Sequence, residues 1–303
     1  MAQIKCGVLT FGYDDAPLFR DTLQRKGYYS INLGDNAQSI AIRHAYRQLG
    51  FAEDLLVSIN RDTLSGYRGE PTYLIMNGVF GLNSFPLPQN IIPIFVGFHA
   101  DELTISQHAD CFRRHQPIGC RDEATAELLR GRGIEAQTTG CLTLTLPRRT
   151  TEPAEPKLMV VYGTMKGRLP GSVLRHIPPD LADTVEFIFH RLPLTNFPPS
   201  AEQRADAEKY EQALLDHFRT EATLVLTPLH HVASPCMAMG IPVIVCRRKL
   251  DPRFTFLQNL IPIYLPKQFK NIDWNPKAPD LTSIRNNLLN WTRERIEAAT
   301  VAA

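Results

Sequence analysis

The stretch TLVLTPLHHVASPCMAMGIPVIV, residues 223–245, has the pattern of a strand, a tight loop, a short helix and a second strand. Two histidines, His230 and His231, lie side by side where the first strand gives way to the helix. In doubly wound α/β folds, ligands lie at the carboxyl ends of the strands. The place of the two histidines therefore raises the question of whether they are catalytic, bind a metal or simply pack.

The alternation of strands and helices continues in both directions from this stretch. Continuous apolar runs bounded by turn residues predict buried strands of a parallel sheet at 73–80 and 91–98. The strongest helical pattern covers 201–222, and Ser200 with Gln203 has the spacing of a capping box. Further strands are predicted at 5–11, 140–146, 157–163 and 185–192. A helix after residues 32–38 is expected to have Asp35 as its N-cap, with Gln38 three residues on.

This alternation predicts an α/β fold with two domains, each built on a mostly parallel sheet. Residues 147–157 contain three prolines and no helical or strand period, which is typical of a linker between domains. We therefore predict domains at 1–146 and 158–280, followed by a C-terminal helix at 281–303. The default ligand site is the cleft between the two domains.

Composition narrows the class of function. The 303 residues are 44% apolar and carry a net charge of +2, so nucleic acid is poorly supported as a partner. The six cysteines form no CxxC pair, which favours reduced thiols over a disulfide framework. We find no signal peptide and no run long enough to span a membrane, and we expect a cytoplasmic protein.

Two segments carry residues suited to anions. In NLGDNAQ (32–38), Asn32 and Gly34 precede a helix N-terminus, which can bind an anion, although an ordinary capped helix start explains the segment equally well. In PIGCRDEAT (117–125), Arg121 follows a strand and could clamp a carboxylate or phosphate. The alternative there is a surface ion pair between Arg121 and Asp122.

A third basic segment, CRRKLDPRF (246–254), contributes Arg247, Arg248 and Arg253 to the same predicted cleft, unless it is only a solvated turn. His231 lies at the predicted helix start, where it could contact phosphate or act as a general acid, unless it only caps backbone groups. Because neighbouring residues of a strand point to opposite faces, we expect at most one of the two histidines to face the cleft. That argues against a shared metal site.

Together these motifs resemble the polysaccharide pyruvyl transferase family. The resemblance rests on NLGDNAQ, GCRDEATAELLRGRGIEA and TPLHHVASPCMAMGIPVIV, in that order, with LIMNGVF, which contains Asn77, and GCLTLTL between them. It runs from about residue 4 to about residue 275. In the family's Thr-x-Arg-Leu-His segment, eight residues separate the histidine from the glycine of G-I-P-V. Counting back from Gly240 gives His231 the histidine's place, and Leu229 stands where the family has arginine.

The resemblance implies two Rossmann-like domains in a GT-B-like arrangement. It implies transfer of a pyruvyl group from phosphoenolpyruvate to two hydroxyls of a sugar, with no cofactor and no metal. His231 and Arg121 would be catalytic. Donor or acceptor would contact Asn32, Gly34, Asp35, Gln38, Asn77, Asp122, His230, Arg247, Arg248 and Arg253.

The implied partners are phosphoenolpyruvate and a sugar or lipid-linked oligosaccharide, with peripheral membrane association through that acceptor. Because Leu229 lacks the expected charge, a nucleotide-sugar glycosyltransferase on the same scaffold remains an alternative. A glycan-binding relative without activity is another. Arg247, Arg248 and Arg253 are the candidates to replace the missing arginine.

Overall fold

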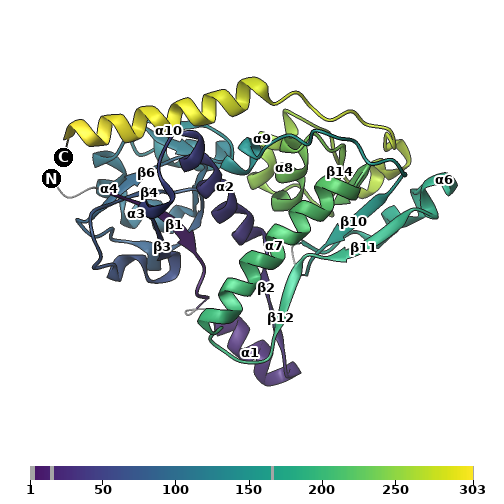
Figure 1. Cartoon of the computed structure of the whole chain (residues 1–303), viewed down its shortest axis with the longest axis horizontal. Helices are drawn as coiled ribbons and strands as arrows, with labels where there is room; N and C mark the ends of the chain where they lie inside the picture. The colour runs from purple at the N-terminus through teal and green to yellow at the C-terminus, as the bar shows by residue number, and fades with distance from the viewer. Residues whose placement is uncertain (1–3, 14–16, 165–166, 303) are drawn as a thin grey trace.

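The computed structural model describes residues 4–13, 17–164 and 167–302. Residues 301 and 302 are described by their backbone alone. It has an α/β fold with mostly parallel sheets, as the sequence predicts (Figure 1). One four-stranded parallel sheet of the first half contains, in order, β3 (Leu56–Asn60), β1 (Lys5–Thr10), β4 (Thr72–Ile75) and β6 (Ile91–Ile94). The other contains, in order, β5 (Gly78–Phe80), β7 (Phe98–Ala100), β8 (Ile118–Cys120) and β9 (Ala136–Thr138).

The second half is built on one five-stranded parallel sheet. It contains, in order, β11 (Val185–Phe189), β10 (Leu158–Tyr162), β13 (Leu224–Thr227), β14 (Val243–Cys246) and β15 (Ile263–Tyr264). The helices are α1 (Pro17–Lys26), α2 (Gly34–Gln48), α3 (Glu102–Gln107), α4 (Ala109–Arg114), α5 (Glu123–Arg130), α6 (Pro179–Ala182), α7 (Ala201–Glu221), α8 (His230–Ala238), α9 (Thr255–Gln258) and α10 (Thr282–Ala302). The strand, helix and strand predicted within 223–245 are therefore β13, α8 and β14.

The strands predicted at 73–80 and 91–98 each prove to be two strands that belong to different sheets. The chain leaves one sheet and enters the other at Asn77 and at Gly97. Gly97 has a φ of +65°, and a Cβ there would lie 2.1 Å from Asn77 Oδ1, so the crossing requires glycine. The apolar run continues through each break because both strands are buried, and periodicity alone cannot reveal the change of sheet.

The strand predicted at 140–146 is wrong: residues Leu142–Thr145 form a 3-10 helix, η4. Its alternating leucines and threonines resemble a half-exposed strand, but all four residues are buried. The hydroxyls find partners inside the protein, since Thr145 Oγ1 donates to Leu142 O at 2.7 Å and Thr143 Oγ1 lies 2.7 Å from Ser234 Oγ on α8. Satisfied hydroxyls allow the segment to be buried without a sheet.

A two-stranded antiparallel ribbon joins the two halves. The strand predicted at 185–192 ends at Phe189, and the chain continues as β12 (Arg191–Leu194). This strand pairs with β2 (Tyr29–Asn32) of the first half, with Arg191 opposite Asn32. Figure 1 shows the ribbon beside α1. Because each half supplies one strand, the ribbon fixes the end of β11 against the start of α2.

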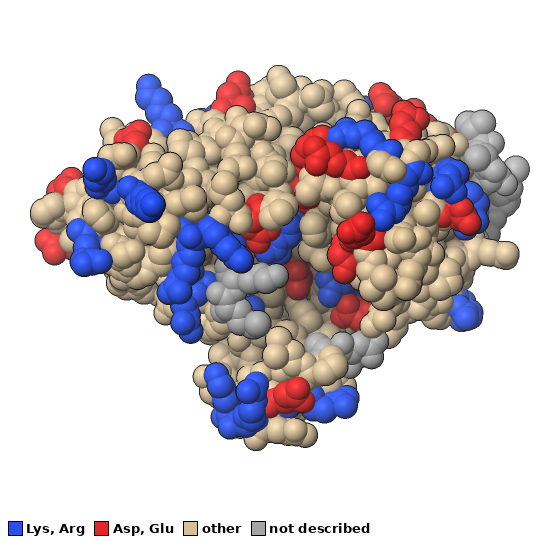
Figure 2. All heavy atoms as spheres, turned by 180° about the vertical axis from the view of Figure 1, so that it is seen from behind, with Lys and Arg blue, Asp and Glu red and all other residues tan. Residues whose placement is uncertain are grey.

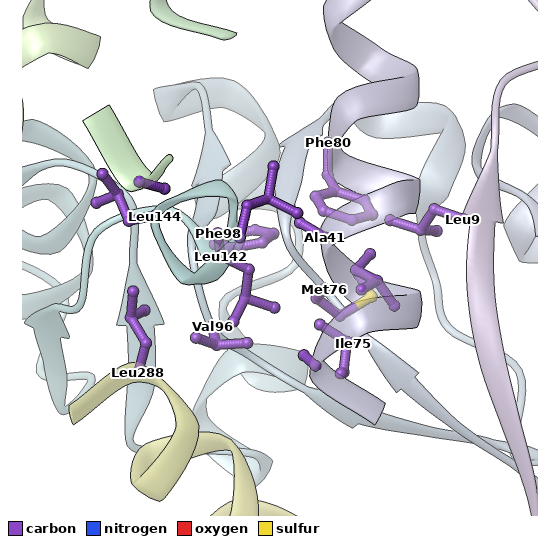
Figure 3. Close-up of a cluster of buried hydrophobic side chains, with 14 of the residues drawn as sticks. Leu9, Ala41, Ile75, Met76, Phe80, Val96, Phe98, Leu142, Leu144 and Leu288 are labelled. Atoms are coloured by element: carbon purple, nitrogen blue, oxygen red, sulfur yellow. The ribbon is translucent and has the colours of Figure 1, made fainter. Parts of the chain in front are cut away.

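The main hydrophobic core also runs through both halves. It includes Leu9 and Phe98 from the first half and Val161 and Leu214 from the second. Figure 3 shows part of it, where Phe98 and Leu142 lie close together and Leu9 points toward Phe80. A smaller cluster of the second half has Trp274 packed against it.

The last helix, α10, returns to the first half (Figure 1). Leu288 enters the main core, and Trp291 Nε1 donates to Phe95 O at 2.9 Å. The segment 147–157 has neither helix nor strand, and Arg149 N donates to Met239 O at 3.0 Å. The domain boundaries stay a prediction.

One predicted local feature of the helices is confirmed and one is wrong. Ser200 and Gln203 form the expected capping box at the start of α7. At α2 the N-cap is Leu33, with no side-chain hydrogen bond, so Asp35 is not the cap. All six cysteines are buried free thiols. None of the described helices has both the length and the apolar character that a membrane span needs. Figure 2 shows acidic and basic side chains mixed over one face.

Candidate active site

A cavity of about 270 Å³ lies at the carboxyl ends of the strands of the second half. Its wall includes Gly163 after β10, His190 after β11, Pro228 after β13 and Arg247 after β14. This is the edge of a parallel sheet where ligands are expected to bind, because the loops that follow the strands converge there.

The first half closes the cavity from the other side. Asn32 lines it at the end of β2, and Arg121 lines it just after β8. Arg253 and Phe254, which follow β14 in the second half, also line the cavity. The structure thus brings together six of the predicted site residues: Asn32, Arg121, His230, His231, Arg247 and Arg253.

Arg121 is a buried guanidinium that lacks hydrogen-bond partners. The side chain is 1% exposed, and its Nε and Nη2 donate no hydrogen bond to any described residue. The nearest carboxylate, Asp122 Oδ2, lies 3.8 Å from Nε. Burial lowers the pKa of Arg121, which means that the fold opposes the charge. A buried cation with free N–H groups beside a cavity is expected to bind an anion there.

Asp122 has a structural role in this arrangement. Its Oδ1 accepts from Thr125 N at 3.1 Å, so it caps α5, and its Oδ2 lies 2.7 Å from His99 Nδ1. Burial alone would raise the pKa of Asp122, but the hydrogen bond with His99 and the charge of Arg121 hold it below its usual range. The alternative of a surface ion pair with Arg121 is wrong, because both side chains are buried.

Both histidines line the cavity, contrary to the expectation that only one would face it. Their ring centroids are 5.0 Å apart, and the ring of His230 lies 5.4 Å from that of Phe254. The expectation used the alternation of a strand, but His230 and His231 form the first turn of α8, where neighbours are not on opposite faces.

The surroundings of both histidines disfavour the charged form of the ring. Burial lowers the pKa of His231 well below its usual value, and the charges of Arg121 and Arg253 lower it further. Burial does the same for His230. At neutral pH each ring is therefore uncharged and has one nitrogen that can accept a proton.

The other predicted residues of the 32–38 segment support the cavity from behind. A Cβ on Gly34 would lie 2.6 Å from His231 Cβ, so this glycine lets α2 approach α8 closely. Asp35 accepts hydrogen bonds from Tyr13 Oη at 2.9 Å and Asn32 Nδ2 at 3.1 Å. Gln38 Nε2 donates to Asp35 at 3.4 Å. Gly34, Asp35 and Gln38 are not among the residues that line the cavity.

Asn77 also lies outside the cavity. It is fully buried, and its Oδ1 accepts from Leu142 N at 3.0 Å. The residue thus fixes the point where the chain passes from β4 to β5. Its predicted contact with donor or acceptor has no counterpart in the cavity wall.

The basic segment after β14 divides between two cavities. Arg247 donates to Pro228 O, lies 3.4 Å from Asp251 and has its guanidinium 4.2 Å from the centre of the Phe254 ring. Arg253 contacts Asp251 at 2.6 Å. A second cavity of about 620 Å³ adjoins the first through Pro228 and Arg247, and its lining includes Arg168, Arg248 and Lys249. Arg248, which is exposed, lines only this second cavity.

Comparison with known proteins assigns the chain to a family. The family model for polysaccharide pyruvyl transferase matches residues 32–249. The chain belongs to the polysaccharide pyruvyl transferase family. As a member it is a transferase that acts on polysaccharide. The match includes the lining residues of the cavity from Asn32 to Arg247, but not Arg253 and Phe254.

More distant similarities come from solved structures. The uncharacterized protein KP1_0663 from Klebsiella pneumoniae subsp. pneumoniae NTUH-K2044 is 14% identical, with a TM-score of 0.41, and the match covers 80% of this chain and 94% of that one. The apo form of the lipopolysaccharide outer core galactosyltransferase WaaB is 11% identical, with a TM-score of 0.33, over 88% of this chain and 80% of that one. No curated protein matches this chain.

Arg191 lies next to the position where this pyruvyl transferase family member has Leu229 in place of arginine. A Cβ on Gly163 would lie 3.5 Å from Leu229 Cδ2 and 3.9 Å from Arg191 Cδ, so the two side chains flank the same glycine. Arg191 lines the cavity, and its Nε donates to Ser30 Oγ at 2.8 Å. Burial lowers the pKa of Arg191. A cation is therefore present beside Leu229.

Sequence reasoning missed His190 and Arg191 because the run VEFIFHRL was interpreted as one strand. The signal that could have found them is the pair of polar residues, HR, that interrupts an apolar run at the carboxyl end of a strand. His190 Nε2 lies 2.8 Å from Glu211 Oε2 on α7. No group of three or more His, Cys, Asp or Glu side chains among the described residues could hold a metal ion. The prediction that no metal takes part stays a prediction.

Proposed function

We propose that this protein transfers a pyruvyl group from phosphoenolpyruvate to two hydroxyls of one sugar residue, which produces a cyclic ketal. The observation that carries the proposal is Arg121, a buried guanidinium with free N–H groups at the wall of a small cavity. Such a group needs an anion to satisfy it. The family indicates a transferase, and the need for an anion at Arg121 favours an anionic donor such as phosphoenolpyruvate.

The charges around the cavity favour a small polyanion. No acidic side chain is among the described residues that line it. Four arginines line it, namely Arg121, Arg191, Arg247 and Arg253. Asp251 neutralises part of this charge through Arg247 and Arg253. Phosphoenolpyruvate carries a phosphate and a carboxylate, so two separate guanidiniums can each take one group. Arg191 then does the work of the arginine that Leu229 replaces.

The reaction needs proton transfers that the cavity can support. C3 of phosphoenolpyruvate gains a proton while the first sugar hydroxyl attacks C2, and the C2–O bond to phosphate then breaks. The second hydroxyl oxygen attacks C2 and closes the ring. Of the two protons that the hydroxyls release, one balances the proton given to C3 and the other leaves with phosphate. His231, whose pKa is lowered by burial, is uncharged at neutral pH and acts as the base for a hydroxyl.

The second cavity provides a place for the acceptor. It adjoins the donor cavity at Pro228 and Arg247 and opens toward Arg168, Arg248 and Lys249. Within the described chain, none of these three cations has an ion-pair partner. A sugar bearing a phosphate, as in a lipid-linked oligosaccharide, would be held there by its charge, which would also bring the protein to a membrane surface.

Phosphate release tests the proposal. Purified protein is mixed with phosphoenolpyruvate and a set of galactosyl, mannosyl and glucuronosyl acceptors. We expect phosphate release that depends on one acceptor, and we expect its loss in folded His231→Ala and Arg121→Ala variants. Unchanged turnover in a folded His231→Ala variant would remove that residue's role. Absence of release with every acceptor would contradict the reaction.

Leu229 supports one rival donor, a nucleotide sugar, because it lacks the charge that the family presents at this position. A ligand that binds only the folded state raises the melting temperature. We expect phosphoenolpyruvate to stabilise the protein and a panel of nucleotide sugars to leave it unchanged. The reverse result would favour glycosyl transfer.

A further inference from the structure

A buried histidine–glutamate pair forms part of the cavity wall. His190, between β11 and β12, lines the cavity, and Glu211 lies behind it on α7. The side chains are 1% and 0% exposed, and His190 Nε2 lies 2.8 Å from Glu211 Oε2. The contact has the distance of an ion pair without the alignment of a hydrogen bond, and both carboxylate oxygens lack a hydrogen-bond donor among the described residues.

This pair has no evident value for the stability of the fold. Burying two ionisable groups costs several kcal/mol per ion in desolvation, and apolar residues of similar size are often as stable or more so. The other close histidine–carboxylate pairs differ. Asp122, beside His99, caps α5, and the pair of His217 with Glu186 is partly exposed. An unsatisfied buried pair at a cavity wall is a candidate for chemistry.

The pair can store a proton. Burial raises the pKa of Glu211, and the charge of His190 opposes that rise only in part. Because His190 Nε2 lies 2.8 Å from Glu211 Oε2, the carboxylate is placed to orient the ring and to stabilise a proton on it. Because Glu211 occupies Nε2, the proton can reach a ligand only through His190 Nδ1. His231, flanked by Arg121 and Arg253, is in the opposite electrostatic setting.

We propose that His190 is the general acid of the pyruvyl transfer and that Glu211 is its positioning residue, while His231 serves as the base. This inference rests on the proposed function. His190 Nδ1 gives its proton to C3 of phosphoenolpyruvate as the first hydroxyl oxygen bonds to C2. The proton of that hydroxyl goes to His231. When the second hydroxyl closes the ring, its proton restores the acid, and the proton on His231 leaves with phosphate.

Several charged groups surround the pair and set its titration. Glu211 faces His190 from α7. His231 acts on the pair from α8, where Cys236 lies near Glu211. Asp35 acts on Glu211 from α2. The cavity arginines face the same space. Removing the carboxylate alone therefore isolates its contribution from charges that remain.

The test compares His190→Ala and Glu211→Gln with a matched control, His217→Ala. His217 sits on α7 in a pair of similar length, 2.9 Å from Glu186, but outside the cavity. We expect His190→Ala to lower kcat about 10²–10⁴-fold, the range of general acid catalysis. Glu211→Gln should lower kcat at least about 10-fold, since carboxylates that orient a catalytic histidine contribute strongly. The control should keep wild-type kcat.

Two readouts separate this role from a structural one. In Glu211→Gln, the alkaline limb of the pH–rate profile should move to lower pH, because the amide no longer stabilises a proton on the ring. The nitrogen NMR signals of His190, assigned by their loss in His190→Ala, should shift in Glu211→Gln without any donor present. Stabilisation by phosphoenolpyruvate should persist in Glu211→Gln, which shows that the site is folded.

The outcomes are distinguishable. If wild type releases phosphate and a folded His190→Ala variant turns over at a similar rate, the acid is elsewhere and this inference fails while the proposed function stands. An unchanged pH profile and unchanged nitrogen signals in Glu211→Gln overturn the role of Glu211. If wild type releases no phosphate with any acceptor, the proposed function fails and takes this role with it.

Discussion

At the scale of single residues, Arg121 is expected to lower the stability of the fold and to favour the binding of an anion. Its guanidinium is buried with two unsatisfied nitrogens, while Asp122 has Thr125 and His99 as partners of its own. Replacing Arg121 with an apolar side chain of similar length would thus remove the unsatisfied guanidinium, while Asp122 would keep its hydrogen-bond partners. The anion binding that we propose for the residue would explain why the fold keeps it.

We predict that Arg121→Met raises the free energy of unfolding by about 1–3 kcal/mol, the desolvation penalty of an unsatisfied group. The same variant should lose all stabilisation by phosphoenolpyruvate. Urea unfolding measures the first effect and thermal shift the second. Arg248→Met is the control: this exposed arginine lies outside the donor cavity, so stability should change by less than about 0.5 kcal/mol. A less stable Arg121→Met protein that still binds the donor would contradict the assignment.

The two cavity histidines predict how stability depends on pH. Burial lowers the pKa of His230 and of His231 in the folded state. Below about pH 6.5 the unfolded chain binds protons that the folded chain does not, so stability is full above that pH and falls below it. The slope reaches about 1.4 kcal/mol per pH unit for each ring.

Urea unfolding of wild type between about pH 7.5 and 5.5 should therefore show falling stability. A variant with both His230→Asn and His231→Asn should have a clearly smaller slope, because it lacks the contribution of these two rings. Equal slopes in the two proteins would show that these rings keep their ordinary titration. Saturation with phosphoenolpyruvate should also flatten the slope, because an anion offsets the charges that disfavour protonation.

At the scale of elements, the contact between α2 and α8 depends on Gly34. An added Cβ would lie 2.6 Å from His231 Cβ, a distance that forces one helix to move. We predict that Gly34→Ala lowers the free energy of unfolding by about 1–3 kcal/mol, as overpacking does. It should also lower kcat because His231 shifts. Kinetics and urea unfolding measure both.

Gly66→Ala is the matched control for this substitution. No heavy atom lies within 4 Å of a Cβ added there, and its φ is not in the left-handed region. We expect wild-type kinetics and a stability change below about 0.5 kcal/mol. A Gly34→Ala protein with wild-type activity would mean that the α2–α8 approach does not position His231.

The elements show what a sequence can and cannot predict here. The strand, helix and strand within 223–245 follow from local signals: apolar runs, a loop, and Gly240 at the end. The splits at Asn77 and Gly97 do not, because buried strands of two sheets give one unbroken apolar run. The strand predicted at 140–146 is wrong for another reason: alternation of apolar and polar residues is typical of a half-exposed strand, but residues Leu142–Thr145 are all buried.

The candidate site was half visible in the sequence. Arg121, His231 and Arg247 could be found because each follows a strand or begins a helix with a recognisable pattern. His190 and Arg191 could not, because β11 and β12 read as one strand. His190 and Glu211 are far apart in the chain, and no local pattern in the α7 sequence predicts that they form a pair. Asp35 shows the converse, a residue with a clear capping signal that tertiary contacts use otherwise.

At the scale of the whole molecule, one core joins both halves, so we predict a single cooperative unfolding transition. The chain has two tryptophans that report on different regions. Trp291 of α10 contacts the first half, and Trp274 packs against the small cluster of the second. Fluorescence of Trp274→Phe and Trp291→Phe variants should give coincident urea transitions.

Separate midpoints for the two tryptophans would show that the halves unfold independently. The shared core would then not couple the unfolding of the two halves. Leu288→Ala sharpens the comparison, because this α10 side chain is buried in the common core. It should lower stability by about 2–5 kcal/mol. Both reporters should move together, and movement of Trp291 alone would again indicate independent halves.

The return of α10 to the first half has a consequence for biosynthesis. The sheets of the first half are synthesised before the helix that packs on them through Leu288 and Trp291. Until residues 282–302 have been made, the nascent first half lacks this helix and presents an uncovered apolar surface. The first half therefore reaches its native packing only after the second half has been synthesised, and not as soon as its own sheets are made.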